Sequence, residues 1–237
     1  MDKRFKPDRT LALGRRMDMT GTARHELKFY ISPSDAAILE KKLEYLLSYD
    51  EHGTDGVYQV KSLYFDDFYD QALSGKMEGD MKLPKFRVRI YNEDLSRKKL
   101  ERKLKRGDMV FKTSIPISDE EYFRFRKHSE CFSHVFPDLK GSFLRPRVII
   151  SYRRKAFVYE PGNVRITIDS QIRASINQNP CLYRPACMIN LPAPENTVFE
   201  VKYTGLFPDH LRVIFQEVGY RQSISKYAAG RLAGIYR

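Results

Sequence analysis

Residues 85–91 read Lys-Phe-Arg-Val-Arg-Ile-Tyr, and this stretch decides the fold. Apolar and cationic side chains alternate along it without a break, which is the period of a β-strand with two unlike faces. The apolar side chains at 86, 88 and 90 share one face, and the cations at 85, 87 and 89 share the other. The polar face of a half-buried strand is ordinarily mixed, because it meets water. A uniformly cationic face is unusual for a solvated surface.

The same alternation recurs in four more segments. They are Glu26–Phe29, Leu100–Lys105, Val164–Asp169 and Phe199–Lys202. Their polar faces concentrate Lys and Arg with an occasional Glu or Asp, whereas a solvated surface tends to intersperse both signs. For any single strand a solvated basic face is the simpler interpretation, but five strands with one pattern favour a common lumen. A closed barrel provides it if the apolar faces turn outward against helices and the charged faces line a water-filled interior.

Helix signals are few and clear between the strands. Ser32 and Ser118 begin capping boxes, Pro208 opens a third helix and Ser225 a fourth. Strands are predicted at about 24–31, 58–66, 83–92, 99–106, 109–117, 146–159, 163–170 and 197–204. The fold class that follows is α+β: an eight-stranded antiparallel β-tunnel, closed into a barrel, with helices packed outside.

The composition is typical of a basic globular protein. The chain has 237 residues, and 42 Lys and Arg against 30 Asp and Glu give a net charge of +12. Residues 1–23 lack a hydrophobic period and are expected to form a disordered leader, and residues 24–237 to form one domain. No apolar run approaches the roughly 18 residues of a membrane span, and no secretory signal is recognisable. The chain has three cysteines, and an odd number suits reduced thiols better than a set of disulfides. Together with the lack of a secretory signal, this number predicts a cytoplasmic protein.

The charge pattern predicts a polyanionic ligand. Arg and Lys pair with phosphate oxygens through charge-assisted hydrogen bonds. Carboxylates among them would repel a polyphosphate unless they bind a divalent cation that bridges to it, and Mg²⁺ prefers one or two carboxylates plus phosphate oxygens. Rows of Glu, Lys and Arg in a tunnel therefore indicate a metal-bound phosphate chain.

Eight segments, in order, resemble the VTC domain, which is the polyphosphate polymerase branch of the triphosphate tunnel metalloenzymes and a relative of the CYTH domain. They are Glu26–Lys28, Ser62–Asp66, Lys85–Tyr91, Leu100–Lys103, Tyr152–Phe157, Val164–Asp169, Phe199–Tyr203 and Ser223–Tyr227. The resemblance implies a tunnel that binds a triphosphate end with Mn²⁺ or Mg²⁺. It also implies a reaction in which the γ-phosphoryl group of ATP is passed to a growing polyphosphate chain and ADP is released.

The resemblance also implies roles for individual residues. Catalytic phosphate contacts are implied for Lys28, Arg87, Arg89, Lys103, Arg153, Arg165 and Lys202. Metal binding is implied for Glu200, with Glu101 or Glu26 nearby. The polyphosphate track is expected to include Lys105, Lys112, Ser225 and Lys226, the last two at a helix N-terminus that offers free N–H groups.

Two further functions fit the same fold, and the first of them is that of a triphosphate hydrolase, which acts on inorganic or nucleoside triphosphates. Hydrolytic relatives begin with Glu-x-Glu-x-Lys, whereas this chain has Arg24-x-Glu26-x-Lys28, which favours polyphosphate synthesis over a triphosphate hydrolase. A non-catalytic polyphosphate-binding module is the third hypothesis. Nucleic acid is not an expected partner, because the aromatic side chains alternate to the face opposite Arg and Lys. The expected ligands are ATP and polyphosphate, or another triphosphate.

Overall fold

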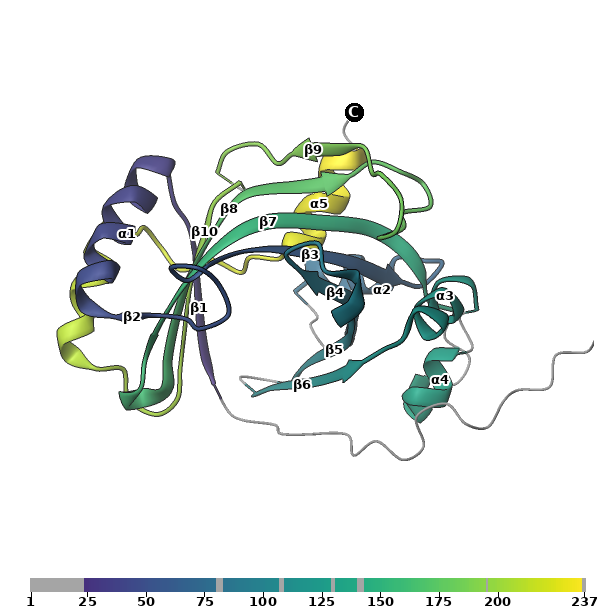
Figure 1. Ribbon diagram of the computed structural model, residues 1–237, viewed down its shortest axis with the longest axis horizontal. Coiled ribbons are helices and arrows are strands. Elements are labelled where there is room, and N and C mark those ends of the chain that lie inside the picture. The colour runs from purple at the N-terminus through teal and green to yellow at the C-terminus, as the bar shows by residue number, and fades with distance from the viewer. Residues whose placement is uncertain are drawn as a thin grey trace, which may run out of the picture.

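One curved antiparallel sheet forms the body of the protein, and helices cover it (Figure 1). The computed structural model describes residues 24–79, 83–106, 109–128, 131–139, 143–194 and 196–235. The leader expected at 1–23 lies outside the described residues.

The eight strands predicted from the sequence are confirmed. They are β1 (His25–Tyr30), β3 (Val57–Asp66), β4 (Lys85–Tyr91), β5 (Lys99–Arg106), β6 (Met109–Pro116), β7 (Arg145–Tyr159), β8 (Val164–Ser175) and β10 (Val198–Tyr203). Hydrogen bonds join them in the order β1-β10-β8-β7-β3-β4-β5-β6, with every pair antiparallel. Two short strands were not expected: β2 (Ser48–Tyr49) pairs with β7, and β9 (Met188–Asn190) pairs with β8.

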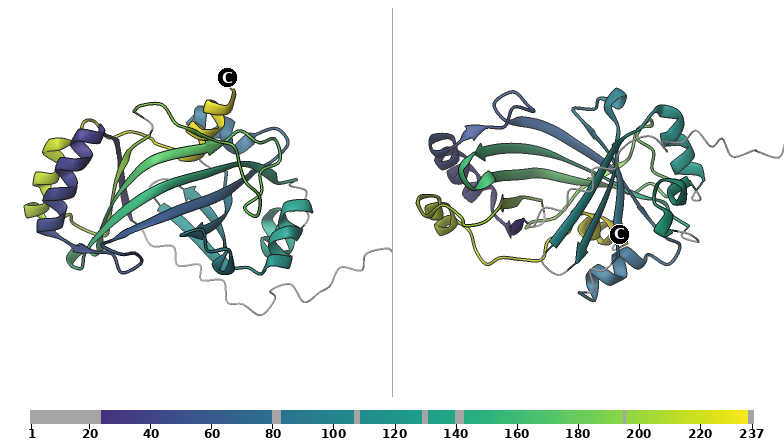
Figure 2. Two further views of the ribbon diagram at one scale, coloured as in Figure 1. Left: turned by 45° about the horizontal axis from the view of Figure 1, so that its top comes forward. Right: turned by 90° about the horizontal axis from the view of Figure 1, so that it is seen from below.

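The sheet is open, which corrects the closed barrel expected from the sequence. β1 and β6 end the strand order, and in the described part of the chain no backbone pairing joins them. Figure 2 shows the resulting half-barrel from two further sides. Charged side chains nevertheless meet across the opening, because Lys103 Nζ of β5 lies 2.9 Å from a carboxylate oxygen of Glu26 of β1. Alternation shows which residues share a face but not whether the last strand reaches the first, so the sequence could not separate the two architectures.

The four predicted helices are present in the described part of the chain, together with two further α-helices and three further 3-10 helices. They are α1 (Pro33–Leu46), α2 (Gln71–Met77), α3 (Asp119–Lys127), α4 (Cys131–Val135) and α5 (Lys226–Ile235), with 3-10 helices η1 (Leu95–Arg97), η2 (Pro137–Leu139), η3 (Pro161–Asn163) and η4 (Asp209–Glu217). Both predicted capping boxes form, at Ser32 and Ser118. The helix predicted after Pro208 is of the 3-10 type, and α2 and α4 were not predicted.

The convex face of the sheet carries the apolar side chains, as the alternation predicts. Phe86 and Val88 are buried with residues of α3 and α4, and Ile166 is buried with residues of α1 and η4. α1 thus covers one flank of the arch, and α3 and α4 cover the other (Figure 1). Burial of these outward faces leaves the charged faces together on the concave side.

α5 departs from the expectation that all helices pack outside. It contacts β7 and β8 on the concave face, where the ring of Tyr227 stacks on Tyr64 with 5.3 Å between centroids. Gly230 allows this close approach, because a Cβ at that position would lie 2.2 Å from Ile150 Cδ1. α5 therefore occupies part of the concave face and brings its first residue, Lys226, to the charged side chains there.

Candidate active site

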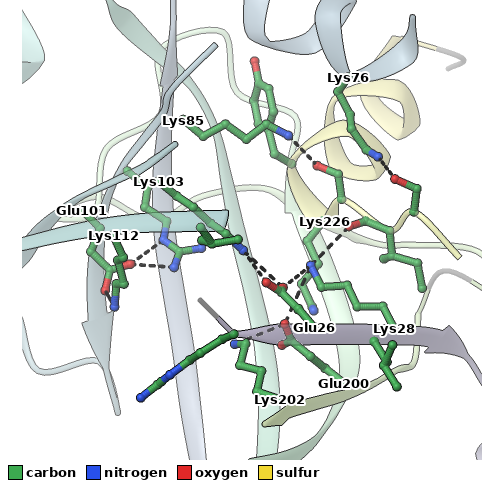
Figure 3. A pocket seen from close by; sticks show the side chains of 18 of the residues that line it. Glu26, Lys28, Lys76, Lys85, Glu101, Lys103, Lys112, Glu200, Lys202 and Lys226 are labelled. Atoms are coloured by element: carbon green, nitrogen blue, oxygen red, sulfur yellow. Dashed lines mark hydrogen bonds and ion pairs between the residues drawn. The ribbon is translucent and has the colours of Figure 1, made fainter. Parts of the chain in front are cut away.

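A cavity of about 500 Å³ occupies the concave face of the sheet (Figure 3). Lys and Arg far outnumber Glu in its lining. The cations are Arg24, Lys28, Lys76, Lys85, Arg87, Arg89, Lys103, Lys112, Arg154, Lys202, Arg221 and Lys226, and the carboxylates are Glu26, Glu101 and Glu200. These side chains come from both ends of the strand order and from α5, so only the folded sheet brings them together. We call this space the phosphate cavity, after the ligand that the sequence predicts.

Most of the predicted site residues line the phosphate cavity. They are Glu26, Lys28, Arg87, Arg89, Glu101, Lys103, Lys112, Glu200, Lys202, Ser225 and Lys226. Arg153 and Arg165 are not among the lining residues, and the side chain of Lys105 lies outside the described part of the protein. The structure thus brings eleven of the predicted residues together, leaves out Arg153 and Arg165 and does not describe the side chain of Lys105; the chemical roles of all of them stay predictions.

Arg154, not Arg153, faces the cavity from β7. Phe157 packs on the convex face with α1, and Lys155, two residues before it, forms an ion pair with Glu44 of α1 at 2.5 Å. Because successive side chains of a strand point to opposite faces, Arg153 shares the convex side with Lys155 and Phe157, and Arg154 lies on the concave side. Three consecutive cations obscure the alternation in this segment, so the apolar Phe157 was the signal that could have identified Arg154.

Arg165 lies opposite Lys202 in the sheet register but is engaged elsewhere. Its guanidinium is 2.5 Å from a carboxylate oxygen of buried Asp50 and donates a hydrogen bond to the Tyr58 hydroxyl at 2.9 Å. Arg165 therefore extends the charged face beyond the phosphate cavity rather than lining it.

Glu26 and Glu200 form a carboxylate pair on neighbouring strands. Lys28 Nζ lies 2.8 Å from Glu26 and 3.8 Å from Glu200, and Lys202 Nζ lies 3.2 Å from Glu200. Burial acts to raise the pKa of Glu200, but Lys202 and Lys28 outweigh it and bring that pKa well below its ordinary value. Burial and Glu200 likewise act to raise the pKa of Glu26, and Lys28 and Lys103 overcome them. Both carboxylates are therefore ionised at neutral pH.

This pair fits a hard divalent cation. Mg²⁺ is usually bound by one or two carboxylates together with substrate phosphate oxygens. No group of three or more His, Cys, Asp or Glu side chains arranged to bind a metal occurs among the described residues. A cation at Glu26 and Glu200 would therefore depend on a phosphate ligand to complete its coordination.

Glu101 is a carboxylate with a different environment. Arg87 lies 2.6 Å from it, Lys112 2.8 Å and Arg89 3.8 Å. Burial acts to raise the pKa of Glu101, but Arg87, Arg89 and Lys112 lower it much more. Three cations already surround this carboxylate, which favours a role in orienting Arg87 over the metal role implied by the resemblance.

Several lysines of the cavity carry poorly compensated charge. Burial, with a contribution from Lys76, lowers the pKa of Lys85 to about 8, and burial lowers that of Lys202 to about 8. Burial and Lys28 also lower the pKa of Lys103. A bound phosphate chain would supply the negative charge that these ammonium groups lack.

The N-terminal end of α5 adds polar groups to the same cavity. Ser225 Oγ accepts a hydrogen bond from the Ala228 N–H at 3.3 Å and lies 3.5 Å from Lys85 Nζ. Lys226 Nζ lies 2.7 Å from Asp169, which Arg154 also contacts at 2.6 Å. Asp169 is thus neutralised by two cations, as an ion-pairing rather than a metal-binding residue would be.

Residues 23–234 match the family model of the VTC domain. The chain belongs to the VTC domain family. This VTC domain has the same fold as two solved structures at low sequence identity. PH1819 from Pyrococcus horikoshii OT3 is 13% identical with a TM-score of 0.54, over 90% of this chain and 99% of that one. HpAC1 from Hippeastrum, whose dominant activity is that of a triphosphatase, is 14% identical with a TM-score of 0.53, over 88% and 95% of the two chains.

No curated protein matches this VTC domain with significance. Among the described residues, no helix combines the length and the apolar character needed to cross a membrane.

Proposed function

We propose that this VTC domain is a metal-dependent phosphotransferase that uses ATP to extend a polyphosphate chain and releases ADP. The observation that carries the proposal is the phosphate cavity itself, in which many cations surround one ionised pair of carboxylates. Phosphoryl transfer requires little covalent assistance, since positioning and charge neutralisation supply most of the catalysis. This cavity offers both.

Six side chains of the cavity would take part in such a reaction. Arg87, oriented by Glu101, presents a planar fork that matches two phosphate oxygens. Lys103 and Lys202 neutralise charge near the carboxylate pair. Glu26 and Glu200 would bind Mn²⁺ or Mg²⁺, and that ion would neutralise charge that develops on the transferred phosphoryl group.

The group that accepts the phosphoryl group distinguishes synthesis from hydrolysis, and the lining of the cavity favours synthesis. A terminal phosphate oxyanion is already a nucleophile, whereas a water molecule must be oriented, usually by a carboxylate. Arg24 lines the cavity at the position where the hydrolytic relatives have a leading Glu. One candidate for orienting water is therefore replaced by a cation that attracts a polyanion.

Incubation with ATP and Mn²⁺, with the phosphate products resolved on a gel, tests the proposal. The expected products are ADP and long-chain polyphosphate. Arg87→Ala and Lys226→Ala should lose chain growth, and Arg97→Ala, at an exposed position outside the cavity, should retain it. If the protein binds polyphosphate tightly but turns over no ATP with either Mn²⁺ or Mg²⁺, it is instead a polyphosphate-binding module.

A triphosphate hydrolase is the second candidate, because HpAC1 shares the fold and has triphosphatase activity. The same gel separates the two functions. Release of only ADP and orthophosphate, with tripolyphosphate cleaved faster than ATP, would contradict synthesis and support hydrolysis.

A further inference from the structure

A second cavity, of about 940 Å³, adjoins the phosphate cavity. It lies between α5, the end of α2 and the segment that includes β9. Its apolar lining consists of Met77, Ile189, Leu191, Pro192, Ala228, Ala229, Leu232 and Ala233, together with the ring of Tyr30. We call it the apolar groove. The lining of the groove is mostly apolar, whereas that of the phosphate cavity is mostly charged.

The two spaces share part of their walls. Lys76, Ser223 and Ser225 line both of them, and the Lys76 ammonium donates a hydrogen bond to the Ser223 hydroxyl. Along β1, Lys28 lines the phosphate cavity, and Tyr30, two residues further on the same face, lines the groove. A single ligand with a polyanionic end and an apolar end can therefore occupy both spaces.

We propose that the apolar groove binds the base and ribose of the nucleotide whose triphosphate occupies the phosphate cavity. The inference rests on the proposed function in taking a nucleoside triphosphate as the substrate. Binding pockets for small molecules are typically about 300–1,000 Å³ in volume, mostly apolar, with a few polar groups that fix orientation. The groove meets each of these conditions, and a base with its ribose is the apolar end that a nucleotide offers.

The groove also distinguishes the phosphoryl donor from the acceptor. A polyphosphate chain has no apolar part, so it gains nothing from the groove and depends on the cations alone. A nucleotide gains binding free energy in both spaces. Its triphosphate then lies at the end of the phosphate cavity that is lined by Lys76, Ser223 and Ser225. The donor therefore enters from the side of α5, which leaves the rest of the phosphate cavity to the chain that grows.

Binding of non-hydrolysable imido analogues of ATP and of tripolyphosphate tests the proposal by calorimetry. Ala229→Leu, whose larger side chain would occupy part of the groove, should weaken binding of the ATP analogue about tenfold, which is a loss of about 1.4 kcal/mol in binding free energy. Binding of the tripolyphosphate analogue should stay within about twofold. Ala37→Leu, an exposed position on α1, is the matched control and should change neither affinity.

Equal losses for both analogues, or no loss for either, would overturn the groove as the nucleoside site. Thermal melting of Ala229→Leu excludes unfolding as the cause. Met77→Ala, at an exposed apolar side chain of the lining, provides a second variant that should weaken only the ATP analogue. Failure of the proposed function has a different signature. In that case the wild-type protein makes no polyphosphate from ATP, while the difference between the two analogues persists.

Discussion

Glu101 and Glu200 are both buried carboxylates on the concave face, with 2% and 4% of their surface exposed. Their neighbours differ in kind. Glu101 is surrounded by two Arg side chains and one Lys, with Arg87 in close contact. Glu200 lies against Glu26 and two Lys side chains, and its one Arg neighbour, Arg154, is 3.9 Å away. A guanidinium fork fixes a carboxylate in one geometry, and paired carboxylates attract a divalent cation. Identical residue types therefore have different predicted roles.

Glu200→Gln tests the metal role. The substitution removes the charge and keeps the shape, so we expect the protein to fold and kcat/KM with Mn²⁺ to fall by about hundredfold or more, as when a preorganised electrostatic group is lost. Excess EDTA should abolish the activity of the wild-type protein. Glu93→Gln, at an exposed ion pair with Lys61, is the matched control. Full activity in EDTA would contradict the metal role.

The lowered pKa of Lys85 leads to a prediction of how phosphate binding depends on pH. Its pKa in the folded protein is about 8 because of burial and Lys76, so the free protein loses this proton as the pH rises through 8. A bound polyanion favours the protonated form. Above pH 8, binding should therefore take up protons and weaken as the pH rises. Calorimetry in two buffers of different ionisation enthalpy measures the uptake, which Lys85→Ala should reduce. An unchanged uptake in this variant would show that other groups titrate.

At the scale of elements, α5 connects the sheet to the site. Tyr227 donates a hydrogen bond to buried Asp66 at 2.6 Å, and Asp66 also accepts the N–H groups of Ala72 and Leu73 at the start of α2. Arg231 pairs with Asp70 at 2.6 Å. These contacts fix α5 against β3 and α2, and with it the position of Lys226 and of the apolar groove.

Gly230→Ala tests the close packing of α5. The new Cβ would overlap Ile150 Cδ1 and lie 3.1 Å from Ala174 Cβ, so we expect a loss of about 1–3 kcal/mol in the free energy of unfolding. Gly234 belongs to the same helix but has no atom within 4 Å of the corresponding Cβ position. Gly234→Ala should therefore be neutral or stabilising by up to about 1 kcal/mol. Denaturant titration measures both, and equal effects would contradict the packing.

At the scale of the whole molecule, the concave face has more positive charge than its own carboxylates can balance. The chain has a net charge of +12, and the lining of the phosphate cavity has far more Lys and Arg than Glu. Mutual repulsion destabilises such a surface until an anion binds. The ligand-free fold should therefore be less stable than the complex.

Tripolyphosphate with Mn²⁺ should raise the melting temperature of the protein. At a ligand concentration of 100 times Kd the stabilisation is about 2.7 kcal/mol, which corresponds to roughly 5–10 °C for a chain of this size. Sodium chloride at the same ionic strength is the control for general screening. An equal shift in sodium chloride would mean that no specific site is occupied.

Sequence alone determined the strands, their two faces and most of the charged side chains that line the cavity, because alternation with period two is local and each side chain of a strand follows from its neighbours. Arg87, Lys103 and Glu200 were found in this way. Arg153 was assigned from the resemblance, and the alternation could not correct this to Arg154 because it is lost where three cations follow one another.

Tertiary structure alone decided what depends on contacts between distant segments. Whether β1 pairs with β6 is set by the curvature of the whole sheet, and the answer is an open half-barrel. The position of α5 inside the arch depends on the fit of Gly230 against Ile150, and the ion pair between Lys103 and Glu26 spans 77 positions of sequence. Such contacts arise from the packing of surfaces that no single segment contains, so no periodicity within the chain could indicate them.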